Sequence, residues 1–301
     1  MAISRAQLAK ELEPGLNALF GLEYGRYENE HSEIFEESSD RAFEEEVMLG
    51  GFATAPVKSE GGAISFDDAQ ETYTARYTHE TIALAFSITE EAIEDNLYDR
   101  LASRYTKALA RSMATTKQIK AAAILNNAFS TGANAIGDGA ALCSSAHPSL
   151  SGNQRNLLST AADLNETSLE QMLIDIAGFT DERGLKIAVR GTKLIIPKEL
   201  QFIAERVMNS NLRSGTADND NNAMKNMGML PEGASVNHFL TDTDAFFIKT
   251  DAPNGFKYFN RAAIKTAMEG DFDTGNMRFK ARERYSFGVS DWRCVFGTPG
   301  A

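Results

Sequence analysis

Residues 71–95, "ETYTARYTHETIALAFSITEEAIED", carry the strongest structural signal in this chain of 301 residues. The first part of the stretch alternates in side-chain character, which is typical of a β-strand. A strand over residues 72–88 spans about 55 Å at roughly 3.3 Å per residue, whereas strands in compact domains are usually about 5 or 6 residues long. We therefore expect that only part of this strand lies in the core of its own chain.

The alternating stretch changes from polar to apolar along its length. Its later half places four apolar side chains on one face, which we expect to be packed: Ile82, Leu84, Phe86 and Ile88. The earlier half continues the same face with polar side chains: Thr72, Thr74, Arg76 and Thr78. Because polar groups on both faces of a strand do not build a core, the earlier half is predicted to reach away from the body of the molecule.

The preceding residues predict the other strand of a hairpin. In residues 46–66, "EVMLGGFATAPVKSEGGAISF", glycines and a proline separate short apolar pieces. Gly61-Gly62 is the best candidate for the tip, because glycine tolerates the backbone angles that tight hairpin turns require. Lys58 and Glu60 are then expected near the exposed tip of an extended hairpin over residues 47–88.

A long helix is predicted directly after the strand. Ser87 and Glu90 form a capping box, and acidic residues fill the first turns. No Gly or Pro interrupts the chain before Gly132, so we predict a helix over residues 89–129, about forty residues long. Its apolar positions recur at helical spacing: Ile93, Leu97, Leu101, Tyr105, Leu109 and Met113. A strict heptad pattern stops after Met113, which favours a helix packed along a sheet over a coiled coil.

The remaining patterns indicate a mixed α+β body. A short N-terminal helix is expected to end at Pro14 and Gly15, and residues 16–46 to form an extended arm. A further helix is predicted, capped by Thr167 and Glu170 and closed by Gly184. Five residues are expected to line one of its faces: Leu169, Met172, Leu173, Ile176 and Phe179. "LKIAVRGTKLIIP", residues 185–197, is interpreted as two short strands, and Pro197 as the first-turn residue of a helix. The loop over residues 211–228 is polar, and strands dominate after Val236.

Composition excludes several classes of protein. The formal net charge is -12, and such a chain is repelled by phosphate backbones, so sequence-specific nucleic-acid binding is not expected. The N-terminal residues lack a signal peptide pattern, and nowhere do eighteen apolar residues run together, so no membrane contact is predicted. The two cysteines, Cys143 and Cys294, are too few for a disulfide framework and suit a reducing cytoplasm.

Charge is distributed unevenly along the chain. Nine acidic residues stand against two arginines between Arg26 and Glu46, and they end in Glu44, Glu45 and Glu46. The segment 278–284 instead carries four basic residues against one acid: Arg278, Lys280, Arg282 and Arg284. Each charged run alone is consistent with a solvated surface. Together they permit a second interpretation, in which the acidic arm of one copy lies on the basic strand of the next.

Known chemical motifs are not found. The four histidines show no metal-ligand spacing, and the glycines near residues 137 and 191 lack the context of dinucleotide or phosphate loops. We therefore predict no catalytic residues, no metal and no cofactors. One alternative of a different class stays open, namely a hydrolase that uses Cys143 as nucleophile and His147 as base.

Three stretches resemble the major capsid proteins of tailed bacteriophages, which share the Hong Kong 97 phage fold, and among them the Mu-like major head subunits. Residues 180–210, "TDERGLKIAVRGTKLIIPKELQFIAERVMNS", resemble a helix, strand, strand, Pro and helix run of that family. "LCSSAHPS", residues 142–149, is similar to its Leu-x-x-x-x-His-Pro loop. "MRFKARERYSFGVSDWRCVFG", residues 277–297, resembles its long peripheral strand and last axial strand. Arg190-Gly191 departs from the family, where a proline often precedes the second strand.

The resemblance implies a domain organisation and a function. It implies an N-terminal arm (1–46), an extended hairpin or E-loop (47–88), a peripheral domain with a long spine helix (89–135 and 262–285) and an axial domain (136–261 and 286–301). It implies a major capsid protein that assembles into hexamers and pentamers of an icosahedral shell around double-stranded DNA, in the virion and in the bacterial host cytoplasm. Implied partners are further copies, a separate scaffolding protein, a portal and decoration proteins.

The resemblance also suggests where copies touch. The candidate contact residues between subunits are Glu44, Glu45, Glu46, Lys58, Glu60, Arg278, Lys280, Arg282 and Arg284. An encapsulin-like shell, which encloses protein instead of DNA, is the nearest alternative, and a generic soluble oligomer is a further one.

Overall fold

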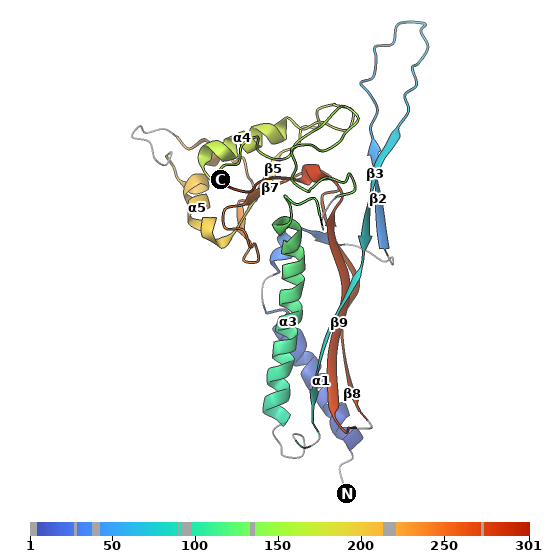
Figure 1. Cartoon of the computed structure of the whole chain (residues 1–301), viewed down its shortest axis with the longest axis vertical. Coiled ribbons are helices and arrows are strands. Elements are labelled where there is room, and N and C mark those ends of the chain that lie inside the picture. Colours follow the sequence, from blue (N-terminus) through green and yellow to red (C-terminus); the bar gives the residue numbers. More distant parts are fainter. Residues whose placement is uncertain are drawn as a thin grey trace.

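A computed structural model describes residues 5–26, 29–37, 43–89, 91, 98–132, 136–212, 221–271 and 274–301. The molecule is L-shaped, with a long upright body, a second body beside its upper end and a hairpin that extends beyond both (Figure 1). The N-terminus lies at the lower end of the long body, and the C-terminus lies in the second body. Helices and strands are mixed along the chain, which confirms the predicted α+β class.

The long body is built on a four-stranded sheet in the order β1 (Glu36–Glu37), β8 (Phe256–Gly270), β9 (Met277–Val289) and β4 (Glu80–Ile88). β9 is antiparallel to both of its neighbours, β8 and β4. Helix α3 (Tyr98–Asn126) and helix α1 (Arg5–Tyr24) pack on one face of the sheet, where Leu109 and Met113 meet Phe279 and Ala281. These four side chains are almost completely buried.

Helix α1 overturns the prediction of a short helix followed by an extended arm. It runs through Pro14 to Tyr24. Proline inside a helix costs about 3 kcal/mol, whereas each fully buried Leu or Phe side chain contributes about 1.5–3 kcal/mol. Leu16 and Phe20 are buried against the sheet and α3, so tertiary packing outweighs the local preference for a break. Residues 29–37, with the 3-10 helix η1 (Glu30–Glu33), also pack on their own chain.

The predicted hairpin is present. β2 (Phe43–Gly50) pairs antiparallel with β3 (Gln70–Thr78), and residues 51–69 form the long loop between them. The turn at the tip lies at Glu60 and Gly61, where Gly61 has φ 76° and the N–H of Gly62 donates to the carbonyl of Ser59 at 3.0 Å. The turn therefore falls one residue before the predicted Gly61-Gly62 pair.

The single long strand predicted over residues 72–88 is divided at His79. β3 pairs with β2, and β4 pairs with β9, so the two halves belong to different sheets. Buried positions are odd-numbered before the division, at Ala75, Tyr77 and His79, and even-numbered after it. Ile82, Phe86 and Ile88 are packed as predicted, whereas Leu84 is 47% exposed near the edge of the sheet.

The long helix is confirmed in its described part. α3 contains 29 residues and ends at Asn126, three residues before the predicted end. Leu109 and Met113 are buried as predicted, but Tyr105 is 49% exposed. The predicted start of the helix, with Glu90, Ile93 and Leu97, lies outside the described residues.

The second body contains a sheet in the order β10 (Val295–Thr298), β7 (Phe246–Thr250), β5 (Gly191–Ile196) and β6 (Ala234–Val236). It is accompanied by α4 (Glu166–Ala177), η2 (Lys198–Leu200), α5 (Gln201–Asn209), α6 (Ala223–Met227) and η3 (Trp292–Cys294). The predicted inward residues Leu169, Met172, Leu173 and Ile176 of α4 are buried, and so is Phe179, which follows the end of the helix. The largest hydrophobic core of the described residues lies here and extends into the upper end of α3.

Local details of this body correct the predicted boundaries. Asn165, not Thr167, caps α4: its side chain accepts from the Ser168 N–H at 2.8 Å, and the Ser168 hydroxyl accepts from the Asn165 N–H at 3.0 Å. α4 ends at Ala177, before Gly184.

The two strands predicted in residues 185–197 reduce to β5 alone, and Pro197 precedes the helical turns as their N-cap. A Cβ at Gly191 would lie 2.8 Å from Leu173 and 2.9 Å from Ile248, so glycine is required where the chain passes the core.

Candidate assembly interface

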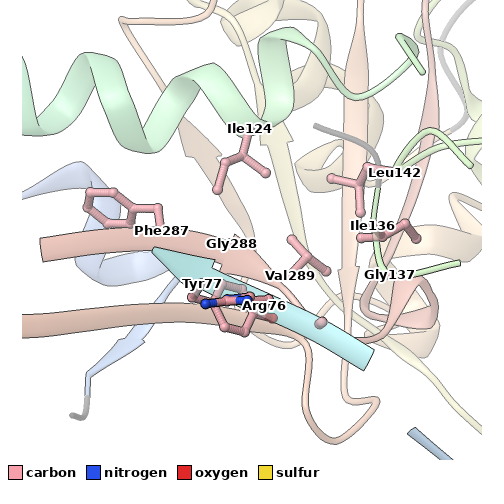
Figure 2. Close-up of a pocket in the computed structure, with 10 residues that line it drawn as sticks. Arg76, Tyr77, Ile124, Ile136, Gly137, Leu142, Phe287, Gly288 and Val289 are labelled. Carbon is pink, nitrogen blue, oxygen red and sulfur yellow. The ribbon is translucent and has the colours of Figure 1, made fainter. Parts of the chain in front are cut away.

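The base of the hairpin crosses strand β9 at close range. Tyr77 and Gly288 lie beside each other in the wall of a cavity (Figure 2), and a Cβ at Gly288 would lie 2.2 Å from the Tyr77 ring. Tyr73 lies against Gly137 in the same way, since a Cβ on that glycine would lie 2.6 Å from the Tyr73 ring. The two glycines therefore allow the hairpin to lie directly on the loop after α3 and on β9. A cavity of about 180 Å³ remains beside this crossing.

Ser290 forms hydrogen bonds with three side chains at the base of the hairpin. The hydroxyl of Tyr73 donates to the Ser290 carbonyl at 3.2 Å, and the hydroxyls of Tyr77 and Ser290 form a short hydrogen bond. The Ser290 hydroxyl also contacts the carboxylate of Glu46. These contacts join β2 and β3 to the end of β9, so the hairpin leaves the body from a defined anchor.

A second anchor joins the loop of the hairpin to the second body. Nη1 of Arg183 lies 3.2 Å from both carboxylate oxygens of Asp67, and Nη2 donates to the carbonyl of Asp68. Asp67 also accepts from the N–H of Ala53 at 2.7 Å, which closes the base of the loop. The Ala53 hydrogen bond, supported by the Arg183 charge, holds the pKa of Asp67 below its usual value.

Beyond these anchors the hairpin loop exposes apolar side chains. Phe52 is 60%, Val57 100%, Ile64 71% and Phe66 96% exposed. Lys58 and Glu60 are also exposed, as predicted. Clustered apolar side chains in water mark surfaces that another molecule covers, and the described residues of this chain leave the loop uncovered.

Five basic residues lie on the outer side of the long sheet, away from the helices, and we call them the basic face: Lys265, Arg278, Lys280, Arg282 and Arg284. Arg278, Lys280 and Arg282 are exposed, and Arg284 is half-buried, because alternate residues of β9 point away from the helices. Lys265 lies opposite Arg282 on β8, and Ala83 lies opposite Arg282 on β4. Lys280 lies between Ala267 on β8 and Ala85 on β4, and these small alanine neighbours leave it accessible.

Within the described residues, the basic face is only partly neutralised. Arg278 forms an ion pair with Asp271 at the end of the hairpin between β8 and β9. Lys280 and Arg282 form no ion pair with the described residues, although both lie on an ordered strand. Unpaired charges on a regular surface are suited to a partner of opposite charge.

The predicted acidic residues are already partly engaged within the chain. Glu45 lies 3.5 Å from Arg76, and Glu46 lies 3.3 Å from Lys257. Glu44 is half-buried on β2. Among the described acidic residues, Glu45 and Glu46 thus lie beside β3 and β8 and form no ion pair with the basic face.

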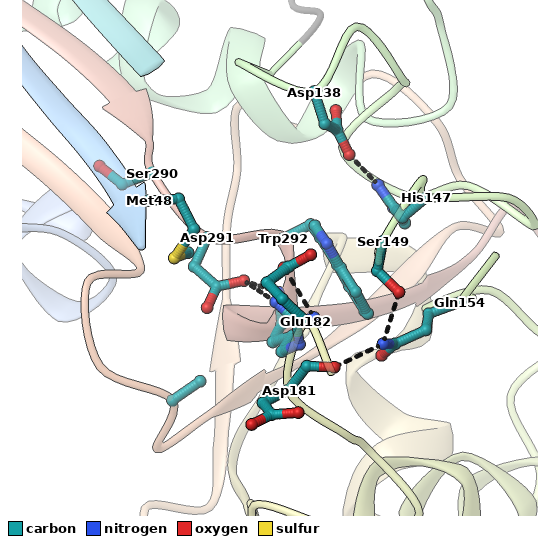
Figure 3. Close-up of polar contacts among 12 residues, drawn as sticks. Met48, Asp138, His147, Ser149, Gln154, Asp181, Glu182, Ser290, Asp291 and Trp292 are labelled. Atoms are coloured by element: carbon teal, nitrogen blue, oxygen red, sulfur yellow. Dashed lines mark hydrogen bonds and ion pairs between the residues drawn. The ribbon is translucent and has the colours of Figure 1, made fainter. Parts of the chain in front are cut away.

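Cys143 and His147 do not form a catalytic pair. Figure 3 shows His147 directed toward Asp138, with 2.7 Å between Nδ1 and the carboxylate, and Nε2 lies 3.0 Å from Oδ1 of Asn156. Both histidine nitrogens therefore have partners, and the ring stacks on Trp292 at 4.4 Å. Cys143 is 2% exposed, and burial raises the pKa of its thiol, which disfavours the reactive thiolate.

Trp292 and Arg293 organise a buried polar cluster that sequence reasoning missed. Arg293 stacks on the indole of Trp292 and forms ion pairs with Glu182 at 3.0 Å and with Asp291 at 3.2 Å. Burial raises the pKa of Asp291, and the neighbouring arginine opposes the shift. A signal was available, because Trp292 is the only tryptophan of the chain and tryptophan is commonly buried at structural centres.

Asn156 connects two of the stretches that resemble the capsid family, residues 142–149 and the end of residues 277–297. Its side-chain amide donates to the carbonyls of Leu142, Trp292 and Val295. The His147 loop and the last strand are therefore joined through one buried side chain. These hydrogen bonds stabilise the second body.

Sites of other kinds are not indicated. No group of three or more His, Cys, Asp or Glu side chains in the described part of the chain is placed to hold a metal ion. None of the described helices combines the length and the apolar character needed to cross a bilayer.

Comparisons with solved structures show the fold. The chain is 12% identical to the capsid of a native gene transfer agent (GTA) particle, with a TM-score of 0.58, covering 91% of each chain. It is 12% identical to the capsid of cyanophage P-SCSP1u, with a TM-score of 0.56, covering 89% of this chain and 86% of that one. It is 9% identical to a virus-like particle from Pyrococcus furiosus, with a TM-score of 0.54, covering 94% and 97%.

The sequence comparison adds the family. No curated protein matches the chain, and nothing found identifies a Mu-like subgroup. Residues 72–297, which are more than half of the chain, match the family described as "Phage capsid protein". The matched region contains the crossing of Tyr77 and Gly288, the basic face and the Trp292 cluster. Because the match covers more than half of the chain, the chain belongs to the phage capsid protein family.

Proposed function

We propose that this chain is the major capsid protein of a tailed bacteriophage or prophage, and that it assembles through hexamers and pentamers into an icosahedral shell around double-stranded DNA. The observation that carries the proposal is the hairpin: it is anchored at its base to two bodies of its own chain, yet its loop leaves Phe52, Val57, Ile64 and Phe66 in water. A protein gains stability from such a loop when a further copy covers it.

We also propose a division of the chain into domains. We assign residues 47–88 to the extended hairpin, 89–135 and 262–285 to the peripheral domain, and 136–261 and 286–301 to the axial domain. Residues 1–46 form the N-terminal segment, of which 5–24 and 29–37 pack on the same chain. The peripheral domain then carries the basic face, and the axial domain carries the Trp292 cluster.

Assembly is proposed to use charge as well as apolar contact. The hairpin exposes Glu60, Asp68 and Glu71, whereas the basic face exposes Lys280 and Arg282. Complementary charge directs two copies into one register, and each contact is repeated throughout a closed shell. The net charge of -12 supports a shell interior from which packaged DNA is repelled and along which it slides.

Further partners are part of the same proposal. A scaffolding protein, a portal and decoration proteins are the expected partners, with assembly in the bacterial host cytoplasm and the virion as the final location. No catalytic activity is proposed, because the buried Cys143 and the fully engaged His147 are suited to packing.

Electron microscopy of the purified protein, alone and with a candidate scaffolding protein, tests the proposal. Closed shells of uniform diameter are expected in at least one condition. A monodisperse, compact monomer under all conditions would contradict it. Shells that contain protein cargo and no DNA after expression with the full set of packaging proteins would instead support the encapsulin-like alternative.

A further inference from the structure

Residues 29–37 lie at the elbow of the L, where the long body meets the second body (Figure 1). The polypeptide passes between the two bodies at the end of α3, between β7 and β8, and between β9 and η3. Residues 29–37 belong to neither sheet except for the two residues of β1. They contact both bodies, and the contacts on the two sides differ in kind.

Toward the long body the segment is held by packing. Phe35 is 6% exposed and packs edge-on against Phe256 and Phe287, and the ring of His31 packs edge-on against Phe287 as well. The N–H of His31 donates to Gln118 on α3 at 3.1 Å. β1 pairs with the start of β8. Apolar burial of this kind is not released by small changes in geometry.

Toward the second body the segment is held by two carboxylates. Glu30 accepts from the N–H of His238 at 3.0 Å and lies 2.7 Å from its Nδ1. Glu33 accepts from the hydroxyl of Ser235 at 2.5 Å and lies 3.6 Å from Nζ of Lys193. Polar pairs that remain partly exposed contribute little individually and exchange readily with water.

A cavity lies on the same side. It has a volume of about 400 Å³ and is lined by Ile34 together with the edge of the second sheet and the loop that enters β8, including Thr192, Lys249 and Lys257. Incomplete packing next to polar pairs leaves room for a small change of angle at the elbow.

We propose that residues 29–37 form an interdomain clasp, fixed to the long body by His31 and Phe35 and closed on the second body by Glu30 and Glu33. The closed clasp holds one angle between the two bodies, and the open clasp permits others. Its consequence for shells rests on the proposed function: subunits at positions of different symmetry need slightly different shapes, and the clasp limits how far the shape changes.

Hydrogen exchange of the unassembled subunit tests the clasp directly. In an E30A/E33A variant, exchange at the His238 amide and across residues 29–33 is expected to rise about tenfold, which is the order expected for two partly exposed polar pairs. The amides that pair β8 with β9 are expected to stay protected, which shows that the fold is kept. The matched control is E232A, because Glu232 lies 3.5 Å from the same Lys193 but does not belong to the clasp.

The outcomes separate this proposal from the proposed function. Unchanged exchange at His238 in E30A/E33A, or an equal rise in E232A, overturns the clasp whether or not shells form. If the wild-type protein forms no shells but exchange rises as expected, the clasp stands and the capsid function fails. If shells do form, E30A/E33A is expected to give a broader distribution of diameters than E232A, and identical distributions contradict the proposed consequence.

Discussion

Tyr77 lies across Gly288, with no room for a Cβ between the hairpin and strand β9. This contact is the point where the extended hairpin leaves the body of the subunit. It combines with the Ser290 hydrogen bonds on one side and with the Arg183–Asp67 pair on the other. The direction of the hairpin is therefore set by a close contact and two polar anchors, and each of them is open to experiment.

Gly288→Ala is expected to destabilise the subunit by about 1–3 kcal/mol, as overpacking does elsewhere. The added Cβ would lie 2.2 Å from the Tyr77 ring, so the hairpin base has to move. Thermal unfolding measures the effect. Gly270→Ala is the matched control on the neighbouring strand, since nothing lies within 4 Å of a Cβ there. Equal melting temperatures for the two variants would show that the crossing tolerates displacement.

Reversal of two charges on the basic face, in a K280E/R282E variant, is expected to leave a folded subunit that does not close shells. Both side chains are exposed, so folding does not depend on them, whereas an acidic partner surface would be repelled. Circular dichroism checks the fold, and electron micrographs check assembly.

The control for that experiment is R104E/K107E, which reverses two exposed charges on α3, on the opposite side of the same body. Normal shells from K280E/R282E would refute a role for the basic face. Loss of shells in both variants would show that net charge, and not the basic face, is responsible.

The Arg183–Asp67 anchor is expected to weaken in acid. The pKa of Asp67 is lowered in the folded protein, so the anchor is fully present above the unfolded pKa of 3.8 and is lost as the pH falls through the lower, folded value. The amide resonance of Ala53, which donates to Asp67, reports this titration. We expect its midpoint below pH 3.8.

Two variants check the assignment of that titration. Arg183→Ala is expected to move the Ala53 midpoint upward, because the neighbouring positive charge is lost. Asp67→Asn is expected to abolish it. A midpoint that does not respond to Arg183→Ala would show that the arginine does not hold the loop.

Cys143 and Cys294 are expected to be unreactive toward a thiol reagent in the native subunit and reactive after denaturation. Both are about 2% exposed, and burial raises the pKa of both thiols, so little thiolate is present near neutral pH. Ser59→Cys provides the positive control, since it places a thiol beside the exposed hairpin turn. Rapid labelling of native Cys143 would revive the hydrolase alternative.

Much of the architecture was predictable because it depends on local periodicity. The alternation of residues 80–88 and the helical spacing through Leu109 and Met113 correctly indicated a packed strand and a long helix. The glycines near residue 61 correctly indicated the hairpin turn. Arg278, Lys280 and Arg282 of β9 are exposed, and they alternate with the buried Phe279, Ala281 and Glu283, as the period of a strand requires.

Features that depend on contacts distant in sequence were not predictable in this way. The division of the long strand at His79 follows from pairing with two different partners, β2 and β9. The continuation of α1 through Pro14 follows from the burial of Leu16 and Phe20. The role of Asn156 required that residues 142 and 292 lie beside each other.

The amino-acid sequence by itself determined the class of the protein and the presence of an outstretched hairpin, since order and periodicity along the chain indicate both, and its resemblance to known capsid proteins indicated the family. Only the tertiary structure decided where the hairpin is anchored, that the acidic residues Glu45 and Glu46 are engaged within the chain, and that residues 29–37 bridge the two bodies. The physical reason is that such contacts depend on distances between segments that no local pattern encodes.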